Sequence, residues 1–550
     1  MQDWKRSTIY QIYPKSFRSA RGGSTGDLAG VIEKLDYLQW LGVDYLWLTP
    51  IYVSPQRDNG YDVADYHAID PRYGSMADFE RLVAEAGARG LKIMMDIVVN
   101  HTSTDHAWFQ AARQSRDNPY RDYYLWRDAP NNWQSKFGGP AWQYDERTGQ
   151  YYLHLFDVSQ ADLNWENPAM RRDIHAMMRF WLDKGVAGFR LDVINLISKP
   201  PDFPEDDSDG RRFYTDGPRI HDHLQEMHRE VFAGRDVLTV GEMSSTSLAH
   251  CIRYSHPDER ELSMTFNFHH LKVDYPGGEK WVAVPYDFVA LKRILSEWQE
   301  GMHLGCGWNA IFWCNHDQPR VVSRFGDDGR YRVQSAKLLA TVLHGLQGTP
   351  YVYQGEEIGM ANPGFGHIEQ YRDVETLNAW RRLVTAGVPA ETAMAAIRQK
   401  SRDNARTPMQ WDAGAHGGFS SAEPWIGLAP DWCEVNVAAQ RSDPDSVLHH
   451  YRHLIGLRKA YPVLVEGAYR CLSLDDPRIW AYLRQSSDAL LLVVGNFSAE
   501  TVRYTVPAGT VPDGATELLS ANYPSPPPLA AQIPLRPYEA VMWHCRLSAG

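Results

Sequence analysis

The sequence lacks three features that would assign it to familiar classes of protein. Its six cysteines are scattered over 550 residues with no C-x-x-C pair, so we expect neither a disulfide framework nor a zinc site. No apolar run approaches the roughly 20 residues that span a bilayer. The first residues, MQDWKRSTIYQIYPKSF, contain no apolar core of a signal peptide. We therefore expect a cytoplasmic protein with reduced thiols.

Positive charge is also in deficit, because 68 acidic residues against 56 lysines and arginines give a formal net charge of -12. Nucleic acids and anionic membranes select basic surfaces, so the sequence predicts neither partner and favours a small-molecule substrate. A hydrophobic content of 43% excludes wholesale disorder. The 19 Trp and 29 Tyr residues offer flat faces that suit sugar rings, although most of them will pack in cores.

Eight short β-branched and aromatic runs alternate with helical stretches. Such runs are typical of parallel strands buried on both faces, and the alternation predicts an α/β fold, a (β/α)8 TIM barrel. The expected strands are residues 9–14, 45–50, 92–98, 188–193, 237–243, 262–268, 310–317 and 349–355.

Two regions interrupt or follow this pattern. The gap after the third strand is too long for one helix, which predicts an inserted subdomain B at 102–172. After residue 467 the pattern changes to short strands with Pro and Gly between them, as expected of a C-terminal antiparallel β-sandwich at 468–550. The catalytic barrel then comprises residues 1–101 and 173–467.

Acidic residues recur at the ends of the expected strands. Asp192 ends one strand, Glu242 another and Asp317 a third, and in a barrel of this kind these ends meet at the reactive face. Arg190 lies two residues before Asp192 and faces the same way, so we expect it to keep that carboxylate ionised. Any one acid alone could be a structural salt-bridge partner. Together they fit glycoside cleavage, which needs one carboxylate to attack and one acid to protonate the leaving oxygen.

Six blocks of sequence resemble the α-amylase superfamily, family 13 of the glycoside hydrolases. The resemblance implies that Asp192 is the nucleophile, Glu242 the general acid/base and Asp317 the transition-state stabiliser, with retention of anomeric configuration. It also implies that Arg190 positions the nucleophile. The blocks are DIVVNH (96–101), QADLNWENP (160–168), GFRLDVIN (188–195), VGEM (240–243), NHD (315–317) and GTPYVYQGEEIGM (348–360).

The same resemblance assigns residues that bind the substrate. His101 and His316 would bind the sugar in the first subsite. Asp58 and Arg406 would pair across the closed end of the pocket and hold the terminal glucose, with Tyr61 stacking beneath it. The stretches that carry this part of the resemblance, to the exo-acting glucosidase branch, are DNGYDVADY (58–66) and SRDNARTPMQW (401–411).

Further stretches narrow the substrate. Val193, directly after Asp192, is a weak sign of the branch that cleaves α-1,6 and other non-α-1,4 links. The segment DDSDGRRFYTDGPR (206–219) and the opening residues resemble trehalose-6-phosphate hydrolases. This resemblance implies hydrolysis of trehalose 6-phosphate to glucose and glucose 6-phosphate. The alternatives are an oligo-1,6-glucosidase (isomaltase) on neutral α-glucosides, a sucrose isomerase and a non-catalytic relative of membrane-transporter subunits.

A phosphorylated substrate requires local positive charge, because a sugar phosphate carries roughly -1.5 to -2 charges near pH 7. The stretch FNFHHLKVDYPGGEKW (266–281) and the pair at 211–212 supply such charge. Each member taken alone fits a solvated surface better than a ligand contact. The candidate phosphate-binding residues are Lys272, Lys280, His270, Arg211 and Arg212, with His269, Gly277 and Gly278 beside them.

We expect no cofactor and no metal ion. Glucosidases of this branch often carry a calcium loop between the first strand and the first helix. Here the corresponding segment, 16–28, places Ser19, Arg21 and Gly23 where ligands would stand, and only Asp27 keeps a carboxylate. Calcium takes six to eight oxygen ligands, and a guanidinium in the loop opposes the cation.

Overall fold

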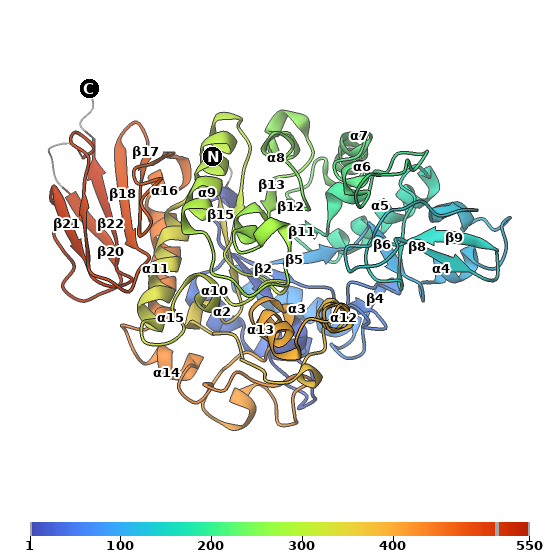
Figure 1. Ribbon diagram of the computed structural model, residues 1–550, viewed down its shortest axis with the longest axis horizontal. Coiled ribbons are helices and arrows are strands. Elements are labelled where there is room, and N and C mark those ends of the chain that lie inside the picture. Colours follow the sequence, from blue (N-terminus) through green and yellow to red (C-terminus); the bar gives the residue numbers. More distant parts are fainter. Residues whose placement is uncertain (1–2, 512–515, 548–550) are drawn as a thin grey trace.

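The structure, a computed structural model, describes residues 3–511 and 516–547. The few other residues, at the two ends and inside the expected C-terminal domain, lie outside the described part. A barrel occupies the middle of the molecule, with small sheets on one side and an antiparallel sheet domain on the other (Figure 1). The eight barrel strands are β1 (Ile9–Ile12), β2 (Tyr45–Leu48), β5 (Lys92–Ile97), β11 (Gly188–Leu191), β12 (Leu238–Met243), β13 (Met264–Asn267), β14 (Ala310–Ile311) and β15 (Thr349–Tyr353).

The barrel strands run parallel in the order β13-β12-β11-β5-β2-β1-β15-β14. A parallel bridge between Thr265 and Asn309 joins the two outer strands and closes the ring. Each observed strand lies inside a predicted range, so the expected TIM barrel is confirmed. The strands are short and almost wholly buried, as expected where side chains fill the inside of the barrel and helices cover the outside.

Helices surround the strands. Side-chain caps fix where several of them begin: Ser75 and Asp78 form a reciprocal capping box on α3, and Asn167 caps α5. The helices between and after the barrel strands are α1 (Leu28–Glu33), α2 (Leu35–Leu41), α3 (Met76–Ala88), α5 (Pro168–Asp183), α6 (Arg211–Tyr214), α7 (Ile220–Met227), α8 (Leu248–Ser255), α9 (Phe288–Leu304), α10 (Val321–Phe325), α11 (Arg332–Gly345), α12 (Val374–Thr385), α13 (Ala390–Lys400), α14 (Val437–Arg441), α15 (Val447–Ala460) and α16 (Val463–Glu466).

Small antiparallel sheets project beside the carboxyl ends of the strands. A hairpin follows β2, and two further sheets and a short helix lie between β5 and α5. They occupy the right of the view in Figure 1. These elements are β3 (Tyr52–Val53), β4 (Asp65–Ile69), β6 (His101–Ser103), α4 (Ala107–Ala112), β7 (Trp126–Arg127), β8 (Trp142–Asp145), β9 (Gln150–Leu153) and β10 (Gln160–Asp162).

The C-terminal domain pairs a five-stranded antiparallel sheet with a two-stranded one. Apolar side chains from both sheets form one core, as in a sandwich. The sheet packs against the barrel through α11, which contacts β18 and β22. The strands are β16 (Ala468–Cys471), β17 (Ile479–Gln485), β18 (Ala489–Asn496), β19 (Val502–Thr505), β20 (Thr516–Ala521), β21 (Gln532–Leu535) and β22 (Ala540–Arg546).

Two observations concern membrane-spanning helices and the state of the cysteines. Within residues 3–511 and 516–547, no helix has both the length and the apolar character that a membrane crossing needs. All six cysteines are free thiols, and Cys306 and Cys433 are exposed.

Candidate active site

One arginine holds three carboxylates at the carboxyl ends of neighbouring strands. Arg190 in β11 stands opposite Asp96 of β5, and Glu242 lies in the next strand, β12. The Arg190 guanidinium donates to Asp96 over 2.8 Å, to Asp192 over 2.5 Å and also to Glu242. The parallel register therefore brings Asp192 and Glu242 together, as the sequence predicted.

The electrostatics of Asp192 differ from the sequence-based expectation. Burial, together with the charges of Glu242 and Asp96, raises the pKa of Asp192 well above its ordinary value, and Arg190 only partly opposes that rise. The expectation that Arg190 keeps the carboxylate ionised is therefore wrong, because burial and the two neighbouring acids outweigh the guanidinium. Asp192 and Glu242 are held side by side by the same guanidinium, which is why the charge of Glu242 contributes to the raised pKa of Asp192.

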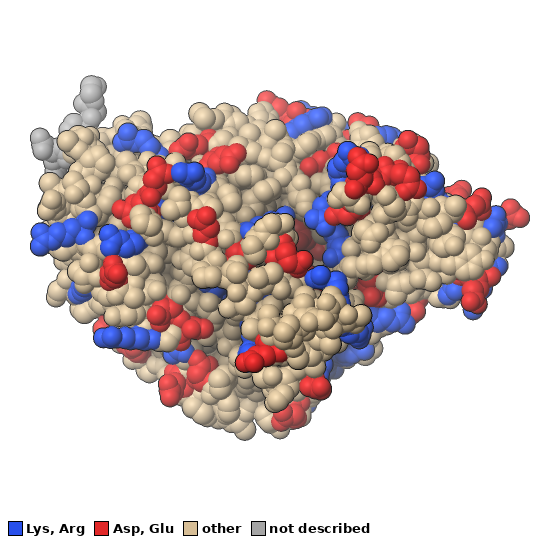
Figure 2. All heavy atoms as spheres, viewed as in Figure 1, with Lys and Arg blue, Asp and Glu red and all other residues tan. Residues whose placement is uncertain are grey.

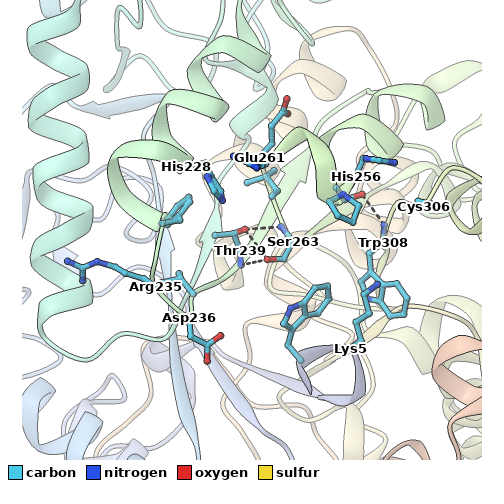
Figure 3. A pocket seen from close by; sticks show the side chains of 17 residues that line it. Lys5, His228, Arg235, Asp236, Thr239, His256, Glu261, Ser263, Cys306 and Trp308 are labelled. Carbon is cyan, nitrogen blue, oxygen red and sulfur yellow. Dashed lines mark hydrogen bonds between the residues drawn. The ribbon is translucent and has the colours of Figure 1, made fainter. Parts of the chain in front are cut away.

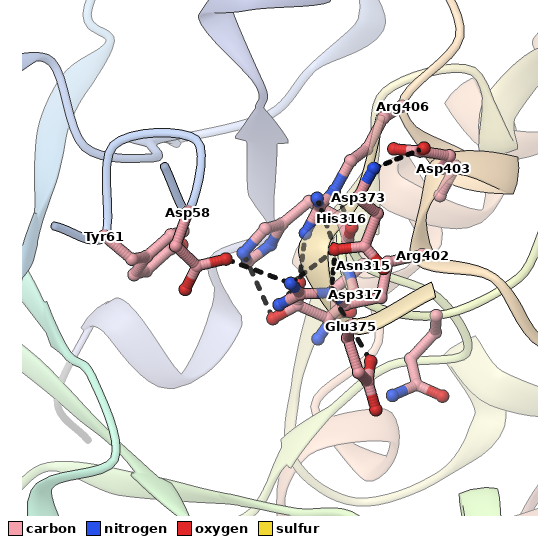
Figure 4. A network of polar contacts seen from close by, with 12 residues as sticks. Asp58, Tyr61, Asn315, His316, Asp317, Asp373, Glu375, Arg402, Asp403 and Arg406 are labelled. Atoms are coloured by element: carbon pink, nitrogen blue, oxygen red, sulfur yellow. Dashed lines mark hydrogen bonds and ion pairs between the residues drawn. The ribbon is translucent and has the colours of Figure 1, made fainter. Parts of the chain in front are cut away.

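Asp317 has the opposite environment. Its carboxylate lies 2.7 Å from Arg406 and 3.3 Å from Arg402, and His316 is adjacent (Figure 4). Burial alone would raise the pKa of Asp317, but these positive neighbours lower it well below the ordinary range. Burial lowers the pKa of His316 to about 3, so at neutral pH the imidazole is neutral and the two guanidiniums keep Asp317 ionised.

One predicted ion pair, Asp58 with Arg406, differs in the structure. Among the ion pairs of the described chain, Asp58 contacts Arg402 over 2.9 Å, whereas Arg406 contacts Asp317 and Asp373. The two arginines lie four residues apart, and the backbone carbonyl of His316 accepts a bond from Arg406 over 2.9 Å that turns it away from Asp58. Burial raises the pKa of Asp58 to about 7, although Arg402 and Arg406 act against the rise.

The predicted sugar-binding side chains surround this centre. Tyr61 donates to Asp96 over 2.8 Å and stacks one ring face on His316, with 5.1 Å between the ring centroids. His101 lies within 3.2 Å of Gln160, and burial lowers the pKa of His101 to about 4. Both histidines are therefore neutral groups that can exchange hydrogen bonds with sugar hydroxyls.

These groups line one pocket. Asp58, Tyr61, His101, Asp192, Glu242 and Asp317 all lie on its wall, whereas Arg190, His316 and Arg406 stand behind it. Figure 2 shows a hollow between the barrel and the inserted sheets, with lysine and arginine side chains along its edge. Among the wall residues that sequence reasoning missed are Lys136, Phe137, Phe156, Gln160 and Arg402.

The predicted phosphate-binding residues separate into two groups. Lys272 and Lys280 lie on the pocket wall, and Lys280 forms an ion pair with Glu375 over 2.7 Å. Arg211 lines the adjoining outer pocket together with both lysines.

His270 and Arg212 lie elsewhere, which corrects their selection. The His270 ring is buried and donates from Nε2 to the carbonyl of Phe312 over 3.0 Å, and burial lowers its pKa to about 3. Arg212 pairs with Asp206 over 2.7 Å and lines neither pocket. A basic residue in the right segment of sequence can still face the core or the bulk solvent.

The segment that corresponds to a calcium loop is organised around one carboxylate. Asp27 caps α1 by accepting from the backbone N–H of Gly30 over 2.7 Å, and it also accepts from the N–H groups of Ala20 and Arg21. The Arg21 guanidinium lies 3.5 Å away. Within the described residues no cluster of three or more His, Cys, Asp or Glu side chains could hold a metal ion.

A second pocket opens at the amino ends of the strands, on the opposite end of the barrel (Figure 3). Lys5 and Trp308 lie on its wall, and Thr239 and Ser263 satisfy each other's polar groups there. It contains none of the predicted site residues. Because reactive groups in such barrels lie at the carboxyl ends, we place the active site in the first pocket.

Comparison with known proteins agrees with this geometry. Residues 11–467 match the family model described as "Alpha amylase, catalytic domain". The chain is 57% identical over 548 residues to a trehalose-6-phosphate hydrolase of Bacillus subtilis, covering 98% of each chain. It is 50% identical to an oligo-1,6-glucosidase of Parageobacillus thermoglucosidasius, covering 99% of each chain. The crystal structure of a Bacillus licheniformis trehalose-6-phosphate hydrolase superposes with a TM-score of 0.96 at 53% identity, covering 99% of this chain and all of the other.

Proposed function

This chain belongs to the α-amylase family, and from that premise we propose that it is a retaining α-glucosidase that hydrolyses trehalose 6-phosphate to glucose and glucose 6-phosphate. One observation carries the proposal. The Asp58–Arg402 pair, Asp192 and Glu242 line the pocket, and Lys136 and Lys272 lie where it adjoins a second, outer pocket. A neutral sugar therefore fits beside the Asp58–Arg402 pair, and an anionic leaving group fits beside the two lysines.

The reaction proceeds by double displacement. Glu242 gives its proton to the glycosidic oxygen while Asp192 attacks the anomeric carbon, which releases glucose 6-phosphate and leaves a β-glucosyl ester on Asp192. Glu242, now a carboxylate, takes a proton from water, and the resulting hydroxide attacks the same carbon and releases glucose with retained configuration.

The remaining site residues bind the glucose that is transferred. Asp317, kept ionised by two arginines, accepts hydroxyl bonds that strengthen as positive charge develops on the ring. Asp58 would hold the terminal hydroxyls, and Tyr61 would present its free ring face to the sugar. His101 would donate or accept hydrogen bonds as a neutral ring, since burial lowers its pKa. His316, behind the wall, supports the ring of Tyr61 by stacking on it.

The phosphate would bind at the outer edge of the pocket. Lys272 is exposed there with no ion-pair partner among the described residues. Lys280 is compensated by Glu375, so it contributes less net charge than Lys272. The oligo-1,6-glucosidase alternative keeps the same catalytic groups but has no need of uncompensated cations at this edge.

A cytoplasmic location also belongs to this proposal. A doubly charged sugar phosphate does not cross a bilayer unaided, so the enzyme must share the compartment in which its substrate is made. Six free thiols, two of them exposed, are compatible with a reducing compartment.

The test compares two substrates in lysine variants. We expect Lys272→Ala to lower kcat/KM for trehalose 6-phosphate by about 10-fold or more, because a lost charge-assisted bond costs about 1.5–3 kcal/mol. Lys280→Ala should lower it less. Neither change should affect a neutral aryl α-glucoside by more than about twofold. Equal losses on both substrates would overturn the assignment of the phosphate to this edge.

A further inference from the structure

Lys136 is carried by a tight turn of the inserted subdomain that reaches over the active site. The N–H of Ser135 donates to the carbonyl of Gly139 over 2.8 Å, and the N–H of Lys136 donates to Leu155 over 2.8 Å. Gly138 and Gly139 have φ angles of 95° and 81°, a region that side chains other than glycine rarely adopt. The turn therefore fixes the direction in which Lys136 points.

The Lys136 ammonium ends beside the catalytic acid. Its Nζ lies 3.0 Å from the hydroxyl of Ser244, two residues after Glu242. No carboxylate of the described chain lies within ion-pairing distance of it. Its other close neighbour is the ring of Tyr214, whose centroid is 5.5 Å away. A half-buried lysine without an anionic partner is costly, so an anion that binds beside it would be stabilised.

Other cations face the same space. The outer pocket adjoins the catalytic pocket, and the two share Lys136, Lys272 and Lys280. Two of the cations lining the outer pocket neutralise its two acids, through the pairs Lys280–Glu375 and Arg382–Glu279. Lys136, Lys272 and Arg381 remain to face an anion, and Arg211, which pairs with Asp209 over 3.2 Å behind the pocket wall, adds its remaining N–H groups. The junction of the pockets is thus cationic in a chain whose net charge is -12.

We propose that Lys136 is a specificity-determining residue, whose ammonium joins Lys272 and Arg211 in binding the dianionic phosphate of the leaving sugar beside the general acid. The inference rests on the proposed function. It assigns selectivity to a residue of the inserted subdomain, whereas Lys272 follows the barrel strand β13. The phosphate is then held by residues of two separate parts of the chain.

The surroundings of Lys136 lower its pKa, so ligand binding should be coupled to proton uptake. Burial and the nearby charges of Arg211 and Lys272 lower the pKa of Lys136 to about 7, with Asp209 and Glu242 acting in the opposite direction. A phosphate dianion favours the charged ammonium. At pH 8 the free phosphate is already a dianion, so binding glucose 6-phosphate should draw a proton onto Lys136.

The experiment uses the full-length enzyme and three variants. Lys136→Met keeps the length of the side chain without its charge, Lys136→Arg keeps a charge that does not titrate, and Lys459→Met removes an exposed lysine of α15 as a control. We expect Lys136→Met to lower kcat/KM for trehalose 6-phosphate by about 10- to 100-fold, mostly through KM. Its rate on a neutral aryl α-glucoside should stay within about twofold, which also shows that it folds. Lys136→Arg should recover most of the loss.

Calorimetry supplies a readout that a structural role would not change. Glucose 6-phosphate is titrated at pH 8 in two buffers of different ionisation enthalpy. The wild type and Lys459→Met should take up a proton on binding, and Lys136→Met and Lys136→Arg should not. Retained selectivity for trehalose 6-phosphate in Lys136→Met, or proton uptake unchanged in that variant, overturns the inference alone. A wild type that does not prefer trehalose 6-phosphate over trehalose overturns the proposed function with it.

Discussion

At the scale of single residues, Arg190 and the arginine pair at 402 and 406 divide the acids of the site into two kinds. Arg190 is shared among Asp96, Asp192 and Glu242, so one positive charge offsets three negative ones. Asp317 alone has two guanidiniums. Asp192 and Asp96 therefore have raised pKa values, whereas Asp317 stays an anion that can stabilise positive charge on the sugar.

The raised pKa values predict how the activity falls at low pH. Asp58 and Asp192 both have a raised pKa, to about 7 for Asp58, and each must be ionised to accept hydroxyl bonds or to attack. As the pH falls through about 7 these groups gain protons, so kcat/KM should fall. The measurement uses a neutral aryl α-glucoside, because the phosphate of the natural substrate itself titrates near pH 6. A profile that stays flat from pH 8 to pH 5 would contradict the prediction.

The limits of sequence reasoning are clearest at this scale. The catalytic acids could be located because each follows a recognisable strand. The partner of Asp58 could not, since Arg402 and Arg406 lie on one short segment and only their contacts with Asp373 and His316 decide between them. Lys136 belongs to no motif and meets Ser244 only through folding. The one indication of its role in the sequence is that it stands alone between an aromatic stretch and a Gly-Gly turn.

At the scale of elements, the Asp27 carboxylate stabilises the backbone of the loop before α1. Asp27 accepts from the N–H groups of Ala20, Arg21 and Gly30, so its oxygens already have donors. The barrel strands were predictable from local pattern, whereas the role of Asp27 as a cap was not predicted. The short sheets of the inserted subdomain were not predictable, because their pairing joins residues with weak periodicity.

The loop yields a prediction about metal and stability. EDTA should leave the melting temperature and kcat unchanged, because Asp27 is the only carboxylate of segment 16–28 and Arg21 stands beside it. Asp27→Ala should cost about 1–2 kcal/mol of stability through loss of the cap, and Asp27→Asn should cost less. Thermal unfolding with and without EDTA measures both effects. A melting temperature that falls on chelation and returns with Ca²⁺ would refute the account of this loop.

At the scale of the whole molecule, one buried lysine ties the barrel to the C-terminal domain. Lys292 of α9 is fully buried and donates to backbone carbonyls of Ser473, Asp476 and Ile479. These carbonyls lie in and just before β17. No described residue of this domain lines the active-site pocket, so we expect the domain to support the barrel and not the chemistry.

Removing that lysine should affect stability and leave catalysis intact. Lys292→Met removes three charge-assisted hydrogen bonds, which we expect to cost about 2–4 kcal/mol. The carbonyl of Asp476 is left without a donor, whereas Ser473 keeps the N–H of Asp476 and Ile479 keeps the hydroxyl of Ser473. Arg293→Met is the matched control, because Arg293 is the next residue of the same helix and makes an exposed pair with Asp475. Melting temperature and kcat are measured for both variants. A large loss of kcat in Lys292→Met at a temperature where it remains folded would show that the domain acts on the site.

The central claim is that the pocket selects a phosphorylated disaccharide, and a direct comparison of substrates tests it. The purified protein is given trehalose 6-phosphate, trehalose or isomaltose at equal concentrations, and the initial rates of glucose and glucose 6-phosphate release are measured. We predict equal release of both products from trehalose 6-phosphate, at a kcat/KM at least about 10-fold above that for either neutral sugar. A higher kcat/KM for isomaltose, with no preference for the phosphate, would contradict the account and favour an oligo-1,6-glucosidase.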